Sequence, residues 1–257
     1  MIKLSARLQT IADLIRRGET VADIGTDHGF LPMSLWETGK SPRVVLSDIR
    51  VGPLKKAEAN ITKHFPDHEF DIRIGNGLKT LKPGEVDVVV IAGMGGLLIS
   101  DILGDDPNRT RSFRRYILQP RNAQKRLRAW LLDNGFRIAD EALVREGKYF
   151  CEIISVVSGN ESTEAESSNL QISTYNGFKI TEYGDMELEI SPLLFIKKDP
   201  LLVEFIENKI RIEEKILEKL KAGAKLDKPY KIKRSEDRID LLKEFRKRSM
   251  SNEYEYE

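Results

Sequence analysis

The sequence has one cysteine, three histidines and no long apolar run, and each shortage excludes a class of protein. A single thiol, Cys151, cannot build a disulfide framework, and with the three histidines it provides too few ligands for a zinc or iron–sulfur site. No stretch reaches the ~18 consecutive apolar residues of a membrane helix. The amino terminus has polar residues every few positions, unlike a secretory signal. We therefore expect a cytoplasmic protein with no metal and no membrane partner.

Neither sign of charge dominates the chain. Forty-two Lys and Arg residues stand against 41 Asp and Glu residues, so the net charge of +1 does not indicate a partner. A hydrophobic fraction of 40% with 32% charged residues is typical of a folded globular protein. The 257 residues are enough for one domain of about 150 residues and a smaller module.

Short β-rich runs alternate with amphipathic helical stretches after an opening helix marked by Leu4, Leu8, Ile11 and Ile15. The predicted strands cover residues 20–24, 43–47, 69–74, 86–91 and 115–118. A helix over 122–133 follows, and then two strands, 136–144 and 149–157, form a hairpin that closes the sheet. This alternation predicts an α/β fold with parallel βαβ units and an antiparallel strand at the end.

The remainder of the chain has a different composition. Residues 158–169 are small, polar and acidic, which predicts a linker. Beyond them, apolar residues recur at helical spacing over 202–220 and again over 232–245, with Gly223 and Pro229 between the two runs. The sequence therefore predicts two domains, 1–158 and 159–257, the second containing an antiparallel, coiled-coil-like helical hairpin.

A glycine-rich turn follows the first predicted strand, where α/β sheets bind nucleotides. The spacing from Asp23 through Gly25 to Gly29 is not the Gly-x-Gly-x-x-Gly of pyrophosphate-binding loops, so a ligand without phosphates fits better. Asp48 ends the second strand, where a carboxylate can bind a ribose diol. Asn76–Gly77, after the third strand, can face an adenine edge. Each feature alone is common in turns and helix caps, but the ordered set favours S-adenosylmethionine.

The fourth strand ends in Ala92, Gly93, Met94, Gly95 and Gly96, and the glycines allow the backbone to approach a flat ligand closely. At this point the chain resembles the bacterial tRNA adenine-N1 methyltransferases that modify adenine 22 in the D-arm. The motifs that carry the resemblance are residues 4–8 (LSARL), 23–32 (DIGTDHGFLP), 75–78 (GNGL), 91–96 (IAGMGG) and 117–120 (ILQP). Where the family tends to have Ala-Tyr after Asp-His, this chain has Gly29-Phe30.

The resemblance implies a Rossmann-like class I methyltransferase sheet that uses S-adenosylmethionine. Adenine N1 carries an in-plane lone pair, so the reaction requires alignment rather than a strong base. We assign Asp27, Gly93 and Met94 to the methyl-transfer centre. The predicted cofactor-binding residues are Arg7, Asp23, Gly25, Thr26, Asp27, His28, Asp48, Asn76, Gly77, Ala92, Gly93 and Met94.

Basic residues cluster between Pro107 and Arg128 with no acidic residue among them, and such clustering is what phosphate neutralisation requires. The predicted RNA-binding residues are Arg109, Arg111, Arg114, Arg115, Arg121, Lys125, Arg126 and Arg128. The last helix adds further lysines and arginines, which fit either a solvated face or an RNA contact. We expect tRNA as the partner and a monomer as the oligomeric state.

Two alternatives stay open from the sequence. One is a non-catalytic cofactor-binding protein whose helical hairpin is a protein-interaction arm. The other is a nicotinamide dehydrogenase, which the missing Gly-x-Gly-x-x-Gly disfavours.

Overall fold

The computed structural model describes residues 1–158, 174–175, 178–179, 184–222 and 228–251. The chain divides into two compact units, Met1–Ile180 and Thr181–Glu257. Each unit is described by itself. Of the predicted linker, residues 159–169 lie outside the described residues.

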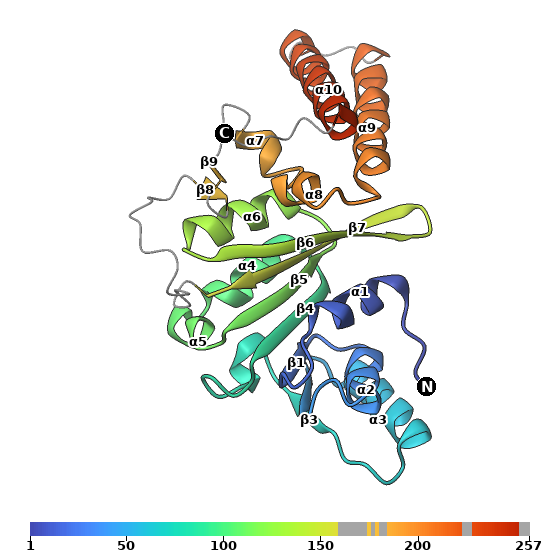
Figure 1. Ribbon diagram of the computed structural model, residues 1–257, viewed down its shortest axis with the longest axis vertical. Helices are drawn as coiled ribbons and strands as arrows, with labels where there is room; N and C mark the ends of the chain where they lie inside the picture. The colour runs from blue at the N-terminus through green and yellow to red at the C-terminus, as the bar shows by residue number, and fades with distance from the viewer. Residues whose placement is uncertain (159–173, 176–177, 180–183, 223–227, 252–257) are drawn as a thin grey trace. The chain divides into compact units, whose positions relative to one another are not determined.

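The first unit alternates strands with helices, as the sequence predicts (Figure 1). Its strands are β1 (Val21–Ile24), β2 (Val44–Asp48), β3 (Asp71–Ile74), β4 (Val88–Met94), β5 (Arg115–Pro120), β6 (Arg137–Glu146), β7 (Tyr149–Val157), β8 (Thr174–Tyr175) and β9 (Phe178–Lys179). Its helices are α1 (Ala6–Leu14), α2 (Phe30–Glu37), α3 (Val51–His64), α4 (Gly96–Gly104), α5 (Pro107–Arg111) and α6 (Gln124–Asp133), with a 3-10 turn, η1 (Gly77–Thr80). Ser5 caps α1, its side chain accepting from the Leu8 N–H.

Seven strands form one sheet in the order β3-β2-β1-β4-β5-β7-β6. The first five in the chain are parallel, and β7 is antiparallel to both of its neighbours. From β1 the chain builds outward to β2 and β3, then returns to place β4 on the other side of β1. The carboxyl ends of β1 and β4 therefore meet at the topological switch point, where open α/β sheets bind ligands. The predicted Rossmann-like fold is confirmed.

The closing hairpin is present, and the strand that comes second in the chain lies inside the sheet. From Glu152 onward every residue of β7 is buried, whereas exposed and half-buried residues interrupt β6. The more completely apolar strand pairs with β5 and is covered on both faces, and the other takes the edge, where one side remains in water.

Helices pack on both faces of the sheet (Figure 1). On one face, Ile11 of α1, Ile15 directly after it and Leu35 of α2 join strand residues such as Val88 and Val90 in one apolar cluster. Helix α3 covers the same face further out, and α4 and α6 cover the other. The central strands are buried from both sides, which explains their continuous apolar runs.

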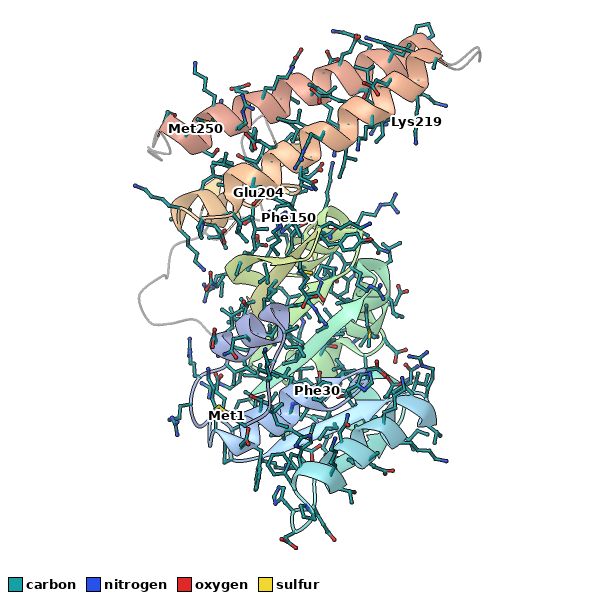
Figure 2. All side chains as sticks on the ribbon, turned by 90° about the vertical axis from the view of Figure 1, so that its right-hand side faces the viewer. Met1, Phe30, Phe150, Glu204, Lys219 and Met250 are labelled. Carbon is teal, nitrogen blue, oxygen red and sulfur yellow. The ribbon has the colours of Figure 1, made fainter. Side chains whose placement is uncertain are left out.

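The second unit contains α7 (Gly184–Glu187), α8 (Pro192–Ile196), α9 (Leu202–Ala222) and α10 (Lys228–Ser251). Helices α9 and α10 run antiparallel. Figure 2 shows Glu204 and Met250 at one end of the pair and Lys219 at the other. Ion pairs cross between the helices in the same order: Glu207 with Arg246, Glu213 with Arg238 and Lys221 with Glu236.

An apolar core holds the second unit together. Phe205 and Ile206 of α9 and Leu242 and Phe245 of α10 are buried, and Phe195 of α8 lies edge-on to Phe245 at 5.8 Å. The predicted helical hairpin is confirmed, while its coiled-coil character stays a prediction. Helix α8 was not predicted, because five residues are too few for a helical period to be recognised. Among the described residues, no helix is both long and apolar enough to span a membrane.

Candidate functional site

The turn after β1 is tied to β2 by its backbone. The N–H groups of Gly25 and Thr26 both donate to the Ser47 carbonyl, at 2.7 and 3.0 Å. Gly25 has a φ of 82°, and a Cβ on it would lie 2.1 Å from the Met94 Cε. The left-handed backbone favours glycine at this position, and any larger residue would have to displace the terminal methyl of Met94. The turn after β1 and the end of β4 are thus packed directly against each other.

Two carboxylates lie near the carboxyl ends of the strands next to this turn. Asp23 of β1 and Asp48 of β2 are 8% and 7% exposed. Burial raises the pKa of Asp23 to about 6, while a hydrogen bond with Thr26 and the charge of Arg7 act in the opposite direction. A buried carboxylate with a raised pKa is stabilised when a cation comes near it. The pair therefore favours a cationic ligand at the carboxyl edge of the sheet.

Asp48 also organises the loops beside it. Its Oδ1 accepts from the Arg50 N–H at 2.7 Å, and its carbonyl accepts from the Gly75 N–H at 3.1 Å. The second contact holds the segment that carries Asn76 and Gly77 next to the carboxylate. The sequence predicts that Asp48 and the Asn76–Gly77 segment bind one ligand, and the structure brings the two together.

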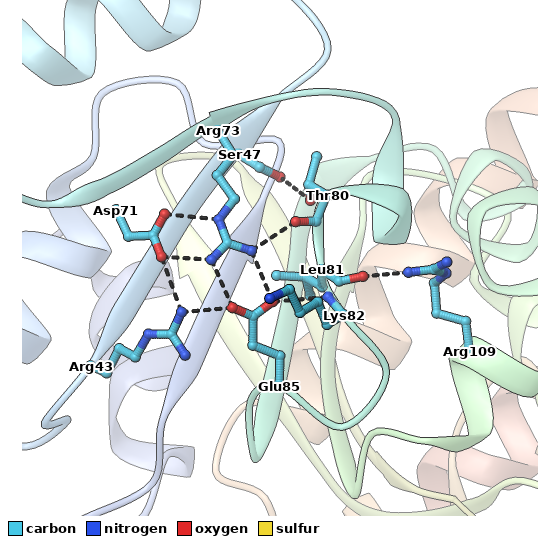
Figure 3. Close-up of polar contacts among 9 residues, drawn as sticks. All are labelled: Arg43, Ser47, Asp71, Arg73, Thr80, Leu81, Lys82, Glu85 and Arg109. Atoms are coloured by element: carbon cyan, nitrogen blue, oxygen red, sulfur yellow. Dashed lines mark hydrogen bonds and ion pairs between the residues drawn. The ribbon is translucent and has the colours of Figure 1, made fainter.

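An ionic network fixes the far side of the same segment (Figure 3). Arg73 donates to the Thr80 carbonyl at 2.8 Å and to both oxygens of Glu85. It also pairs with Asp71, which pairs in turn with Arg43. The Thr80 hydroxyl lies 3.2 Å from the Ser47 hydroxyl. These contacts clamp the turn that follows Asn76 to β2 and β3.

The end of β4 is held by a buried side chain that the sequence analysis did not assign. Gln119 of β5 is 2% exposed, and its Oε1 accepts from the Gly93 N–H at 3.1 Å and from Arg7 Nη1 at 3.2 Å. Arg7 also pairs with Glu146. The signal for Gln119 was its position within the ILQP motif, since an amide in an otherwise apolar strand requires hydrogen-bond partners.

The glycines at the junction of β4 and α4 serve different purposes. Gly93 has a φ of 76°, and a Cβ built on it meets nothing within 4 Å, so its backbone borders open space. A Cβ on Gly96, by contrast, would lie 2.7 Å from the Asn122 carbonyl oxygen, to which the Gly96 N–H donates. The Arg121 N–H donates to the Met94 carbonyl at 2.7 Å. Backbone hydrogen bonds therefore hold the turns after β4 and β5 together, while the Cα of Gly93 faces open space.

Asp27 and His28 lie on the surface of the turn. Their side chains are 58% and 45% exposed, with His28 Nε2 3.2 Å from an Asp27 oxygen. Lys56 Nζ lies 3.4 Å from the other oxygen of Asp27. The His28 ring stacks on that of Phe30, with 5.6 Å between the ring centroids. Asp27 is thus close to the site but is already partly neutralised by a lysine.

The predicted basic patch does not form one surface. Arg128 and Arg115 are buried and do not belong to it: Arg128 pairs with Glu141 and Glu152 at 2.8 and 2.7 Å, and Arg115 pairs with Glu19. Both were counted with the patch because spacing alone does not reveal a buried ion pair.

The remaining basic residues lie at two edges of the sheet. One group comes before the amino end of β5 and comprises Arg109, Arg111 and Arg114. Within it, Arg109 donates to the Leu81 carbonyl. Arg121, Lys125 and Arg126 follow the carboxyl end of β5. Six strand residues at about 3.3 Å each separate the two groups. Only the second group lies at the edge that carries the candidate site.

The groups gathered at this edge of the sheet fit a cationic nucleoside ligand without phosphates. Two buried carboxylates, glycine backbone facing open space and an amide-bearing loop all meet at one edge. Within the described residues, no group of three or more His, Cys, Asp or Glu side chains is placed to hold a metal ion.

Comparisons with known proteins agree with this arrangement. Residues 4–154 match the methyltransferase domain family. The tRNA (adenine(22)-N(1))-methyltransferase of Bacillus subtilis is 29% identical over 244 residues, covering 95% of this chain and 97% of that protein. The crystal structure of the B. subtilis M1A22 tRNA methyltransferase TrmK has a TM-score of 0.77 at 29% identity, over 96% and 100% of the two chains. The M. capricolum TrmK structure, in complex with S-adenosyl-homocysteine, has a TM-score of 0.73 at 26% identity, over 95% and 98%.

Proposed function

The chain belongs to the methyltransferase family, within it to the tRNA adenine-N1 methyltransferases, and we propose that it methylates N1 of adenine 22 in the tRNA D-arm. The observation that carries the proposal is the meeting of Asp23, Asp48 and Gly93, whose Cα faces open space, at the switch point of the sheet. The likeness to the B. subtilis enzyme spans both proteins almost completely, so the non-catalytic alternative loses its support.

The cofactor is S-adenosylmethionine, which supplies an activated methyl group to the adenine N1 lone pair. Asp48 binds its ribose diol, because the carboxylate has an oxygen besides the one that accepts from Arg50. Asn76 and Gly77 lie along the adenine edge. Arg7, Asp23, Gly25, Thr26 and His28 would hold the cofactor's charged end.

Asp23 and Arg7 have complementary charges for an amino-acid moiety. The ionised Asp23 attracts a cationic group, and a cation beside it would favour its ionised form. Arg7, fixed by Gln119 and Glu146, faces a carboxylate with its remaining donors. This arrangement binds a zwitterion and a sulfonium without any phosphate contact.

At the reaction end the protein aligns rather than deprotonates. Adenine N1 has no proton to lose, and the positive charge passes from the sulfur to the adenine ring as the N1–methyl bond forms and the sulfur–methyl bond breaks. Ala92, Gly93 and Met94 hold the base and the methyl group in line. Asp27 stabilises the cationic ring, in competition with its pairing to Lys56.

tRNA is the macromolecular partner. Arg121, Lys125 and Arg126 provide phosphate contacts beside the site, and the helical hairpin provides a second basic surface. We assign residues 1–158 to the methyltransferase domain and 159–257 to the linker and hairpin. A protein with this substrate acts in the cytoplasm, and we propose that it does so as a monomer.

Methyl transfer from labelled S-adenosylmethionine to unmodified tRNA, followed by nucleoside analysis, tests the function. We expect label in 1-methyladenosine and none in a transcript whose adenine 22 is replaced by guanine. Label at another nucleoside, or cofactor binding without transfer, would contradict the proposal.

A further inference from the structure

The first unit exposes its large hydrophobic side chains along one edge. Apart from Met1, those exposed in the described part of the unit all belong to segments at the carboxyl ends of the parallel strands or to the hairpin beside them. They are Phe30, Ile49, Val51, Ile74, Leu97, Leu98 and Tyr149. Apolar surface gathered on one side of a protein marks a binding surface.

Part of this surface belongs to the cofactor under the proposed function. Ile49 adjoins Asp48, and Ile74 precedes the loop that carries Asn76. Leu97 and Leu98 lie elsewhere, in the first turn of α4 directly after Gly95 and Gly96. They are 49% and 51% exposed, whereas the next residue, Ile99, is fully buried. Two consecutive exposed leucines at the reaction end have no role in the core.

The turn that carries the two leucines has a rigid base. The Gly96 N–H donates to the Asn122 carbonyl at 3.0 Å, and Ile99 donates to Gly95 at 3.0 Å. A side chain at residue 96 would collide with this backbone, so the close approach of the two turns depends on glycine. Leu97 and Leu98 therefore project from a fixed position and not from a free loop.

Two exposed arginines lie on the segments that pack against this turn and α4. The turn against which Gly96 packs carries the exposed Arg121, and Arg126 is exposed in the first turn of α6. Cations next to apolar side chains fit a nucleic acid strand, whose phosphates and base faces alternate, better than they fit an apolar protein surface. The occupant that this combination favours is RNA.

We propose that Leu97 and Leu98 pack against the bases flanking the target adenine and fill the space it leaves when it turns out of the D-arm. The inference rests on the proposed function. Adenine N1 lies on the Watson–Crick edge, so the base must leave its pairing partner before it can react. Apolar side chains inserted beside an extruded base offset the lost stacking.

The test compares two tRNA substrates with the full-length protein. One unmodified transcript has an intact D-arm, and in the other the nucleotide that pairs with adenine 22 is changed so that the adenine is unpaired. For the Leu97→Ala/Leu98→Ala double variant, we expect kcat/KM to fall about tenfold or more on the intact transcript and about threefold or less on the unpaired one. The Kd for S-adenosylmethionine, measured by calorimetry, should not change.

The control is Ile74→Ala, which removes a somewhat more exposed aliphatic side chain on the cofactor side and should leave the ratio of the two kcat/KM values unchanged. Leu97→Met/Leu98→Met keeps the apolar volume and should retain most of the activity. Equal losses on both transcripts, or no loss, would overturn the proposal while leaving the methyltransferase assignment intact. A wild-type protein that methylates neither transcript would overturn both.

Discussion

Gln119 Oε1 accepts a hydrogen bond from the Gly93 N–H at 3.1 Å, and this bond joins β5 to the backbone near the end of β4. The same oxygen accepts from Arg7 Nη1, so one buried amide orients both the backbone at the reaction end and the arginine at the edge of the site. Its Nε2 donates to the Pro120 carbonyl, which fixes the amide orientation.

Replacing Gln119 with leucine should lower the rate of methyl transfer. The free energy of unfolding should fall by less than the barrier to methyl transfer rises. The Gly93 N–H would lose its acceptor, and a lost hydrogen bond of about 1 kcal/mol corresponds to a rate decrease of roughly five- to tenfold. Single-turnover transfer with saturating cofactor measures this effect. Gln119→Glu keeps an acceptor for both donors and should recover part of the rate. A leucine variant with wild-type turnover would show that the bond does not position Gly93.

Asp48→Ala should weaken S-adenosylmethionine binding at least about tenfold, because charge-assisted hydrogen bonds to the ribose contribute roughly 1.5 to 3 kcal/mol. Calorimetry with the purified protein gives the affinity directly. Asp133→Ala, at the exposed end of α6, is the matched control and should bind normally. Unchanged affinity in the Asp48 variant would show that this carboxylate does not bind the ribose.

Cofactor binding should weaken as the pH falls through 6. Burial raises the pKa of Asp23 to about 6, so in the free protein this side chain becomes neutral below that value and no longer attracts a cation. We expect the Kd for S-adenosylmethionine to rise about tenfold between pH 7 and pH 5. In Asp23→Asn the Kd should be weak and should lack this dependence. A wild-type Kd that is constant over this range would exclude ionised Asp23 from cofactor binding.

The same carboxylate should reduce the stability of the protein without cofactor at neutral pH. The pKa of Asp23 is raised from 3.8 in the unfolded chain to about 6 in the folded protein. The contribution of protonated Asp23 to the free energy of unfolding is therefore fully present below pH 3.8 and is lost as the pH rises through 6. Asp23→Asn should therefore be more stable than the wild type at pH 8, by up to about 3 kcal/mol, and nearly equal to it at pH 4. Urea unfolding measures the difference. A less stable asparagine variant at pH 8 would contradict the assigned cause of the shift.

Arg73→Met should destabilise the protein at neutral pH by roughly 1 to 2 kcal/mol and should also weaken cofactor binding. Hydrogen bonds from Arg73 hold the pKa of Glu85 and that of Asp71 below their usual values. Carboxylates with depressed pKa values contribute stability above their unfolded pKa, and this stability is lost as the pH falls through the folded one. The difference from wild type should therefore shrink in acid. Lys82→Met, which leaves these ion pairs intact, is the control.

Removal of residues 181–257 should leave a folded domain that binds S-adenosylmethionine, because the described sheet is complete by Val157 and the first compact unit ends at Ile180. The cut belongs before α8, since its Phe195 packs edge-on against Phe245 of α10 and so belongs to the second unit. tRNA affinity and its salt dependence should both decrease, because fewer phosphates are neutralised. Filter binding over a salt series measures both. An unaltered salt slope would exclude the hairpin from RNA binding.

Local patterns in the sequence determined most of the element types. The apolar runs predicted β1 to β5, and the helical spacing predicted α1 and the two long helices. Asp23, Gly25, Asp48, Asn76 and Gly93 were predicted to share a site because each lies at or near the carboxyl end of a parallel strand. Those positions depend on chain order and on strand ends, which are local properties.

Only the tertiary structure decided which charges are available at the surface. Arg115 and Arg128 have the same residue type and spacing as their exposed neighbours, but a buried arginine is distinguished by the carboxylates that meet it, and Glu19, Glu141 and Glu152 come from distant segments. The inner position of β7, the dual role of Gln119 and the two edges of the basic cluster were likewise decided by long-range packing. A sequence pattern records which residues follow one another, whereas burial and hydrogen bonding depend on which residues are brought together from far apart in the chain.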